Sequence, residues 1–378
     1  MKRVLINASN LHAGGGVQVA ASFILELSKM LRRFTSYKIY VFASSAVNDN
    51  LMSCGFNRTD IERYQVLDVR GMQALKGYIA EQFYGFDLVF TIFGPLYLPR
   101  KVPNHVVGFA QSWIIYPRNE TVGKLPLRSR LTMRIKFLLQ WWFFKMSARL
   151  VVEQEHVKKG IENLKSFPSD QIDVVNNCFS EIYLDESRWR PLSTLECLDD
   201  EAIKLGYLTR DYPHKNIDFL DDVSRELQRI STRKYRFVVT LTETEWLRRS
   251  PEFRSHVFNV GSISVAQCPT FYRAMDAVFF PSLLESFSAT PLEAMVMRLP
   301  LFASNRGFVR DCCGDHALYF DPIDAEQAAR RIEDWFSRTL QEVRMAHIED
   351  AYRHVRSLPG SRERAAAYVK IINKQLAI

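Results

Sequence analysis

The sequence predicts an α/β fold made of two doubly wound domains with a cleft between them. Two observations lead to this prediction. Short apolar runs alternate with segments of helical character, and this pattern lapses once and then restarts. The chain also has 378 residues, more than one typical domain of roughly 150 residues. Its 47% hydrophobic and 24% charged residues are typical of a globular protein that folds.

The first domain is predicted over residues 1–180. Its apolar runs are RVLIN (3–7), KIYVFAS (38–44), DLVFTIF (87–93), HVVGFA (105–110), RLVVE (149–153) and IDVVNN (172–177). Helical segments separate most of these runs, a pattern that favours parallel strands joined by helical crossovers.

The second domain is predicted over residues 201–359, after a polar, aperiodic linker at 181–200. Its runs are IKLGYLT (203–209), RFVVTLT (236–242), VFNVG (257–261), AVFFPS (277–282), LPLFAS (299–304) and ALYFDP (317–322). Residues 360–378 have helical spacing and strong helix formers, so we expect a final helix that packs back on the first domain.

The remaining composition limits the location and the partners of the chain. The N-terminus reaches polar residues at Asn7 and reads as a strand, not as a signal peptide, and no apolar run approaches the roughly 20 residues that span a bilayer. Six cysteines without zinc spacing suggest reduced thiols. We therefore expect a cytoplasmic protein, and its net charge of +8 favours anionic partners.

Three consecutive glycines follow the first predicted strand. Gly14, Gly15 and Gly16 precede a helix, so their backbone N–H groups can approach an anion such as phosphate at the helix N-terminus. The alternative is a flexible strand-to-helix turn. The third position of a dinucleotide-binding GxGxxG pattern is Val19, which disfavours an NAD enzyme.

Two cations follow the first strand of the second domain. Arg210 and Lys215 lie five residues apart in YLTRDYPHKN, on a loop that is expected to open a helix. Such cations can neutralise a diphosphate, both in the ground state and as charge builds on a departing one. The alternative is a pair of solvated surface side chains.

Two glutamates follow a later strand. In PSLLESFSATPLEAM, Glu293 fits the third position of a helix whose N-cap is Thr290, which would form a capping box. Glu285 comes directly after the strand and has no such explanation. Carboxylates at one strand end can instead accept hydrogen bonds from sugar hydroxyls.

This part of the sequence resembles family 4 of the retaining, nucleotide-sugar-dependent glycosyltransferases. The resemblance rests on a strand that ends in Pro-Ser, on the two glutamates, and on the upstream Arg and Lys loop. It is strong over 203–322 and weak over 45–150. It implies the GT-B architecture, which consists of two Rossmann-like domains.

The resemblance also implies roles for single residues. Glu293 would hold the ribose of the nucleotide, Glu285 would contact hydroxyls of the donor sugar, and Arg210 and Lys215 would bind the diphosphate with help from the glycine loop. The nucleotide base would lie near Gly261, Ile263 and Ser264. Where the family more often has Glu-Gly-Phe-Gly, this chain has Glu285 followed by Ser286, Phe287 and Ser288, whose hydroxyls could take part in donor binding.

The chain departs from the family on the acceptor side. The family often has a His-Asp or His-Glu pair after a strand of the first domain, where this chain has Gln111 and Ser112, neither of which is a general base. Catalysis would then depend on positioning and on stabilisation of the leaving diphosphate. The sequence has no DxD-type metal motif, so we expect metal independence and no cofactor besides the nucleotide-sugar.

Residues 121–150 suggest how an acceptor could be reached. They contain seven Lys or Arg residues, no acid, and FLLQWWFF at the centre. A basic helix with aromatic residues can lie on an anionic membrane. The resemblance suggests a polyprenyl-diphosphate-linked sugar as the acceptor. The alternative is a helix that packs within the first domain.

The sequence therefore predicts a retaining hexosyltransferase of surface polysaccharide assembly, such as O-antigen or capsule. It would use a nucleoside-diphosphate sugar and would lie in the cytoplasm or at the inner face of the cytoplasmic membrane. Two alternatives stay open: a nucleotide-sugar epimerase of the same fold, and a basic nucleic-acid-binding protein, which would not explain the two glutamates.

Overall fold

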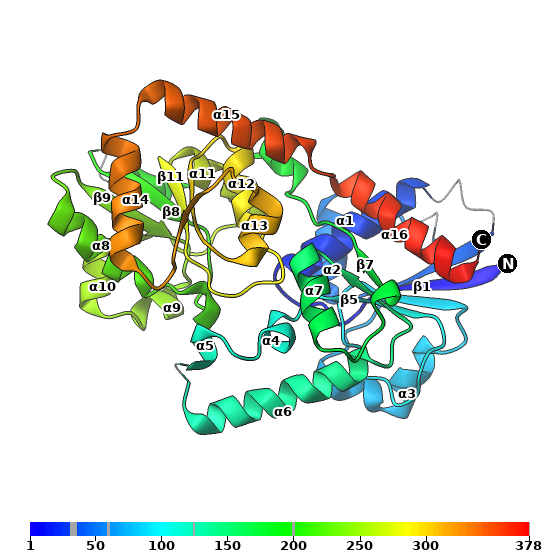
Figure 1. Cartoon of the computed structure of the whole chain (residues 1–378). Coiled ribbons are helices and arrows are strands. Elements are labelled where there is room, and N and C mark those ends of the chain that lie inside the picture. Colours follow the sequence, from blue (N-terminus) through cyan, green and yellow to red (C-terminus); the bar gives the residue numbers. More distant parts are fainter. Residues whose placement is uncertain (31–35, 59–60, 124, 199–200, 378) are drawn as a thin grey trace. The chain divides into compact units, whose positions relative to one another are not determined.

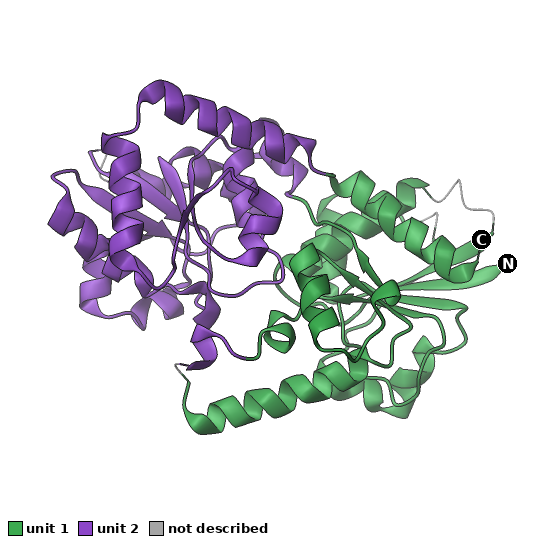
Figure 2. Ribbon diagram, viewed as in Figure 1, with its two compact units in different colours: residues 1–117, 125–178, 359–378 green, residues 118–124, 179–358 purple. Residues whose placement is uncertain are grey.

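The computed structural model describes residues 1–30, 36–58, 61–123, 125–198 and 201–377. The chain divides into two compact units (Figure 2). Unit 1 comprises residues 1–117, 125–178 and 359–378, and unit 2 comprises 118–124 and 179–358. Of the positions named in the sequence predictions, Lys124, Asp199, Asp200 and Ile378 lie outside the described residues.

The described residues of unit 1 form a parallel sheet in the strand order β3-β2-β1-β4-β5-β6-β7. The strands are β1 (Lys2–Ala8), β2 (Tyr37–Ala43), β3 (Arg63–Val66), β4 (Leu88–Thr91), β5 (His105–Phe109), β6 (Arg149–Val152) and β7 (Ile172–Val174). The α-helices are α1 (Gly15–Met30), α2 (Ser45–Ser53), α3 (Gly77–Ala80), α4 (Ser112–Ile115), α6 (Leu127–Phe144), α7 (Glu155–Asn163) and α16 (Ser361–Leu376). Figure 1 shows helices on both faces of this sheet.

Every apolar run predicted in the first half contains a strand, because continuous apolar runs suit strands that are buried on both faces. The strand that the sequence did not reveal is β3, whose residues RYQV are partly or fully exposed. Among the described strands it pairs with β2 alone, at the edge of the sheet. This edge strand carries no apolar run that could mark it.

The final helix, α16, packs within unit 1. Ala365, Tyr368 and Ile372 are buried in the same apolar core as Phe23 of α1. The Tyr368 ring lies edge-on to the ring of Phe23, with 5.0 Å between their centroids. The C-terminus of the chain thus completes the core of the domain that the N-terminus begins.

Unit 2 has a second parallel sheet, in the order β10-β9-β8-β11-β12-β13. The strands are β8 (Ile203–Tyr207), β9 (Tyr235–Val239), β10 (Val257–Asn259), β11 (Ala277–Phe280), β12 (Leu301–Ser304) and β13 (Leu318–Phe320). The α-helices are α5 (Glu120–Gly123), α8 (Phe219–Ile230), α9 (Glu243–Leu247), α10 (Pro251–His256), α11 (Cys268–Arg273), α12 (Thr290–Val296), α13 (Gly307–Cys313), α14 (Ala325–Ser337) and α15 (Gln341–Ser357). Each run predicted in the second half contains one of these strands.

The segment expected to be a linker, 181–200, is folded against unit 2 where it is described. It forms short 3₁₀ turns, Glu181–Leu184, Glu186–Arg188 and Ser193–Cys197. Ile182, Tyr183 and Leu198 are buried in the core of unit 2. The absence of a helical or strand period hid these contacts, since 3₁₀ turns have no long apolar repeat.

In unit 2 the strand order reverses between β8 and β11. In doubly wound sheets, ligands bind beyond the carboxyl ends of the strands at such a point, because the loops that follow the two strands turn in opposite directions. The loops after β8 and β11 carry Arg210, Lys215 and Glu285. The fold therefore places three of the predicted site residues where this class of sheet binds ligands.

Candidate donor site

Lys215 and Glu285 form an ion pair between the loops that follow β8 and β11. Lys215 Nζ lies 2.5 Å from Glu285 Oε1, and the two side chains are only 16% and 11% exposed. Burial acts to lower the pKa of Lys215, but the Glu285 carboxylate outweighs it and the pKa is raised. The Ser282 hydroxyl, 2.8 Å from the same Glu285 oxygen, also donates to it. Lys215 therefore stays charged, and Glu285 is held before any ligand arrives.

Hydrogen bonds to the backbone hold the two loops that carry this pair. Leu283 N donates to the carbonyl of His214 at 2.8 Å, which ties the two loops together. The Tyr207 hydroxyl donates to the carbonyl of Lys215 at 3.1 Å, and Asn216 turns the chain with a φ of 55°. Asn is one of the residues that tolerate this left-handed conformation, so the loop can end sharply before α8.

Glu293 lies on α12 and is oriented by two tyrosines. The Tyr272 hydroxyl donates to Glu293 Oε2 at 2.8 Å, and the Tyr183 hydroxyl also donates to this carboxylate. Burial raises the pKa of Glu293, while the two tyrosines and Lys215 act in the opposite direction. Glu293 is thus a partly buried acid whose charged form is costly and whose hydrogen bonds come from fixed donors.

The capping-box explanation of Glu293 is wrong. The N-cap of α12 is Ala289, which has helical backbone angles, and Thr290 is the first helical residue. The Glu293 side chain contacts tyrosines and not the cap. Helix capping therefore does not explain why residue 293 is a glutamate.

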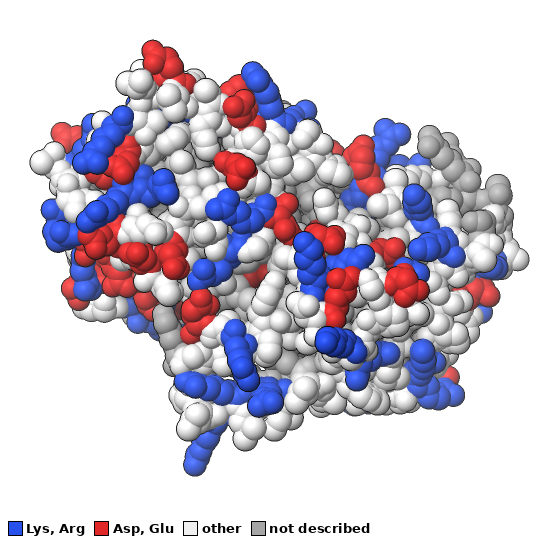
Figure 3. Space-filling model, in the orientation of Figure 1, with Lys and Arg blue, Asp and Glu red and all other residues white. Residues whose placement is uncertain are grey.

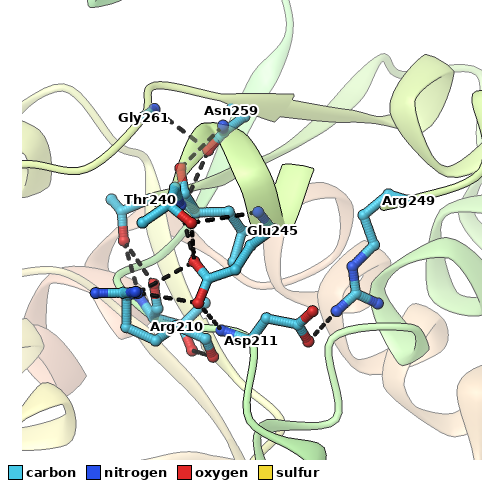
Figure 4. Close-up of polar contacts among 10 residues, drawn as sticks. Arg210, Asp211, Thr240, Glu245, Arg249, Asn259 and Gly261 are labelled. Atoms are coloured by element: carbon cyan, nitrogen blue, oxygen red, sulfur yellow. Dashed lines mark hydrogen bonds and ion pairs between the residues drawn. The ribbon is translucent and has the colours of Figure 1, made fainter. Parts of the chain in front are cut away.

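Arg210 contacts a residue that the sequence did not single out, Glu245 at the first turn of α9. Arg210 Nε lies 3.1 Å from both carboxylate oxygens of Glu245 (Figure 4). Burial acts to raise the pKa of Glu245, but the bonds from Arg210, Thr242 and Asp211 outweigh it and lower the pKa to about 2. The Arg210 side chain itself is 54% exposed.

Polar side chains link the ends of β8, β9 and β10 (Figure 4). Thr209 N donates to Thr240 Oγ1 at 2.9 Å, and Thr240 Oγ1 donates back to the carbonyl of Thr209 at 3.0 Å. Asn259 Oδ1 accepts from Leu241 N at 2.8 Å and from Gly261 N at 3.2 Å. Gly261 has a φ of 81°, which favours glycine at this turn.

The other predicted donor residues lie in unit 2 with varied surroundings. Ser286, Phe287 and Ser288 are half-buried in the loop between β11 and α12, and Phe287 packs against the core. Ile263 also packs against the core, while the Ser264 hydroxyl lies 3.0 Å from Gln267 Oε1 in a local capping box. The Ser264 side chain is thus engaged in its own turn.

The predicted phosphate loop and the acceptor residues belong to unit 1. Gly14, with a φ of 73°, precedes α1, which begins at Gly15 and includes Gly16. Gln111 is the N-cap of α4 without a side-chain capping bond, and Ser112 is buried at the first position of that helix. These residues follow β1 and β5, so they lie at the carboxyl edge of their own sheet.

Sequence reasoning missed Glu245, Tyr272 and Tyr183. The signal for Glu245 was present, because Thr242 and Glu245 form a capping box directly after β9. Tyr272 and Tyr183 carry no motif. They reach Glu293 from α11 and from the segment expected to be a linker, a proximity that only the fold reveals.

Residues 197–354 match the family model described as glycosyl transferases group 1. This range contains Arg210, Lys215, Glu245, Glu285 and Glu293. Comparison with curated proteins gave no match.

Solved structures resemble the whole chain. A glycosyltransferase from Rickettsia africae superposes with a TM-score of 0.69 at 14% identity and covers 99% of both chains. Anabaena Alr3699/HepE in complex with UDP and glucose has a TM-score of 0.67 at 13% identity, with 99% and 100% of the two chains covered. WaaG, a glycosyltransferase involved in lipopolysaccharide biosynthesis, has a TM-score of 0.66 at 14% identity, with 98% and 99% covered.

These likenesses extend over both units and agree with the two parallel sheets. The chain has the GT-B fold of glycosyltransferases, and its residues 197–354 carry the sequence match to glycosyl transferases group 1.

Proposed function

We propose that this protein is a retaining, nucleotide-sugar-dependent glycosyltransferase of family 4 whose donor site lies in unit 2. The observation that supports this most strongly is the arrangement of Lys215, Glu285 and Arg210 on loops that follow β8 and β11, where the strand order reverses. Glu293, held by two tyrosines, lies in the same matched segment.

In this proposal the two acids and the two cations have separate tasks. Glu293 accepts hydrogen bonds from the ribose, and Glu285 accepts them from the transferred hexose. Arg210 and Lys215 face the diphosphate, where positive charge stabilises the leaving group as its bond to the sugar breaks. Gln111 and Ser112 would line the acceptor side, and the glycine loop at Gly14 to Gly16 would assist with phosphate. The donor phosphate would carry the acceptor's proton, since Gln111 and Ser112 are not bases.

The donor is a nucleoside-diphosphate sugar in this proposal, and UDP is the first base to test because the Anabaena neighbour binds UDP and glucose. The reaction needs no metal ion, since two cationic side chains can take its place. Release of nucleoside diphosphate from the sugar nucleotide in EDTA, lost in Glu285→Ala, would support both points. Activity that disappears in EDTA and returns with magnesium or manganese would overturn metal independence.

The acceptor is a glycan in this proposal, carried on a polyprenyl diphosphate, and α6 supports a membrane location. No described helix is long and apolar enough to cross a bilayer. Six large apolar side chains of α6 are nevertheless 43% to 79% exposed: Leu127, Leu131, Ile135, Leu138, Leu139 and Trp142. At 100° per residue they fall within an arc of about 120° on one helix face.

The opposite face of α6 packs into unit 1. Trp141 and Phe144 are buried against Phe109, and Trp141 Nε1 donates to Ser166 Oγ at 3.0 Å. The two alternatives weighed for this segment are thus compatible, because one face packs while the other is open.

Basic side chains lie within and beside the exposed apolar face. Arg128, Arg130, Arg134 and Lys136 are exposed on the same helix, which has no Asp or Glu. Figure 3 shows blue side chains among white ones along α6. An apolar stripe with basic side chains within and beside it suits an anionic lipid surface, where each Lys or Arg adds about 1 kcal/mol of binding free energy. By analogy, the setting is O-antigen or capsule assembly at the inner leaflet.

The alternative enzyme is a nucleotide-sugar epimerase of the same fold. It would convert its sugar nucleotide without any acceptor, so NMR of the sugar products separates the two activities. The basic nucleic-acid-binding protein is not favoured, because it gives no task to Glu285 and Glu293.

A further inference from the structure

We propose that Glu245 is a positioning residue of the donor site. It holds the Nε edge of Arg210 so that the two Nη groups are turned toward the diphosphate. This inference rests on the proposed function, because it assigns Glu245 a role that acts through Arg210.

Arg210 makes its side-chain hydrogen bonds from one edge of the guanidinium group. Within the described residues, both side-chain hydrogen bonds of Arg210 leave from Nε, to Glu245 Oε1 and Oε2 at 3.1 Å each. Neither Nη group takes part in them, and the side chain is 54% exposed. The Nη groups supply up to four N–H donors, which can bind phosphate oxygens as a fork.

Glu245 is itself firmly held. Thr242 N and Thr242 Oγ1 donate to its Oε2 at 2.8 and 2.9 Å, and Asp211 N lies 3.3 Å from its Oε1. The side chain is 15% exposed. A carboxylate fixed by the cap of α9 and by the loop after β8 can fix the guanidinium in turn, which reduces the entropy lost when an anion binds.

A second interpretation of Glu245 predicts the opposite effect on nucleotide binding. Glu245 carries a negative charge, so it could simply neutralise Arg210 and compete with the diphosphate for it. Removal of the charge would then strengthen nucleotide binding. If Glu245 positions Arg210, its removal weakens donor use, even though the local charge becomes more positive.

The other cation of the site differs from Arg210. Lys215 is 16% exposed and is already paired with Glu285 at 2.5 Å. The Lys215 ammonium is thus already engaged by Glu285, whereas the two Nη groups of Arg210 make no side-chain hydrogen bond within the described residues. The orientation of Arg210 should therefore matter more for recognising the diphosphate than its charge alone.

A double-mutant cycle tests the inference on the full chain. The variants are Arg210→Ala, Glu245→Ala and the double variant, measured by titration with UDP and by KM and kcat for UDP-glucose. A lost charge-assisted hydrogen bond weakens binding by roughly 10- to 150-fold, so we expect this range for Arg210→Ala and about 10-fold for Glu245→Ala. In the Arg210→Ala background, Glu245→Ala should add no further loss.

Two further variants separate positioning from helix capping. Thr242→Ala removes the cap hydroxyl of α9 and one of the donors to Glu245, but it keeps the Thr242 N bond and the pair of Arg210 and Glu245. It should therefore lose stability and lose less UDP affinity than Glu245→Ala. Glu245→Gln keeps one acceptor for Nε, so its activity should lie between those of wild type and Glu245→Ala.

Each outcome has a distinct meaning. Tighter UDP binding by Glu245→Ala and Glu245→Gln, or losses that simply add in the double variant, would overturn the positioning role while leaving the donor site in place. An Arg210→Ala variant with unchanged UDP affinity and turnover would instead contradict the assignment of the diphosphate to Arg210, and thus the proposed function.

Discussion

Lys215 and Glu285 form an ion pair that should stabilise the fold and that, in the proposed function, also contacts the donor. The pair is mostly buried, and a buried ion pair whose partner is removed leaves an uncompensated charge. The sequence placed both residues at strand ends but gave no sign that they touch, because Lys215 and Glu285 are separated by 70 positions. Only the return of the chain from β8 to β11 brings them together.

Replacement of Lys215 should therefore destabilise the fold and abolish activity. We expect Lys215→Met to lower the free energy of unfolding by about 3 to 5 kcal/mol, since Glu285 loses its partner. The double variant Lys215→Met/Glu285→Gln should regain most of this stability and stay inactive. Urea denaturation followed by circular dichroism measures the effect.

Lys234→Met provides the matched control for this experiment. Lys234 pairs with Glu201, but the two side chains are 64% and 77% exposed, so the loss should be at most about 1 kcal/mol. Equal stability of the Lys215 and Lys234 variants would contradict the buried pair.

Glu293 should make stability depend on pH in an identifiable direction. Its pKa is raised, so the protonated form is favoured in the folded state. The stability that Glu293 contributes through its protonated form is fully present below the ordinary pKa of a glutamate. It is lost as pH rises through the raised pKa. Glu293→Gln should therefore gain stability relative to wild type as pH rises toward neutrality, while its affinity for the nucleotide falls.

Glu245→Gln should show the opposite dependence of stability on pH. The pKa of Glu245 is lowered to about 2, so its contribution is present above the ordinary glutamate pKa and is lost as pH falls toward 2. Unfolding measured from about pH 2 to neutrality should show the stability of wild type rising relative to Glu245→Gln between about pH 2 and the ordinary glutamate pKa, and no further change above it. The raised pKa of Glu293 would be contradicted if the stability of wild type relative to Glu293→Gln also increased with pH.

At the scale of single elements, the sequence revealed strands better than short helices and turns. Buried strands such as β11, AVFF, are continuous apolar runs and were found from that property alone. The helix α12 was expected, but its start was misplaced by one residue because Thr-Pro resembles a cap. The 3₁₀ turns at 181–198 and the edge strand β3 have no apolar period, so the sequence could not place them.

The exposed face of α6 should bind anionic membranes. We expect wild type to sediment with vesicles of phosphatidylcholine and phosphatidylglycerol. Binding should weaken in Leu131→Gln/Leu138→Gln and in a variant with Lys124, Arg128, Arg130 and Arg134 replaced by Gln, because apolar burial and lipid attraction both contribute.

Control variants for α6 come from α14. Arg330 and Arg331 of α14 and Arg338 at its C-cap are exposed, and their replacement by Gln removes three positive charges elsewhere. Equal vesicle binding by wild type and by the two α6 variants would dispose of the membrane face, and equal weakening by the α14 variant would reduce it to a general effect of net charge.

At the scale of the whole molecule, the double repetition of strand and helix in the sequence corresponds to two units with separate parallel sheets. The repetition could be predicted because each doubly wound sheet needs continuous apolar strands with helical crossovers. The partners of each site residue could not be predicted, because they depend on loop conformations. Glu245, for example, meets Arg210 only because β8 and β9 are neighbours.

The central claim is that unit 2 binds a nucleoside diphosphate through Glu293 and its neighbours. Thermal unfolding in EDTA with UDP, GDP, ADP or NAD, for wild type and Glu293→Ala, tests it most directly. One nucleoside diphosphate should stabilise wild type, by about 2.7 kcal/mol at 100 times its dissociation constant, and should stabilise the variant less. NAD should have no effect. Unchanged melting with all four ligands would contradict the donor site.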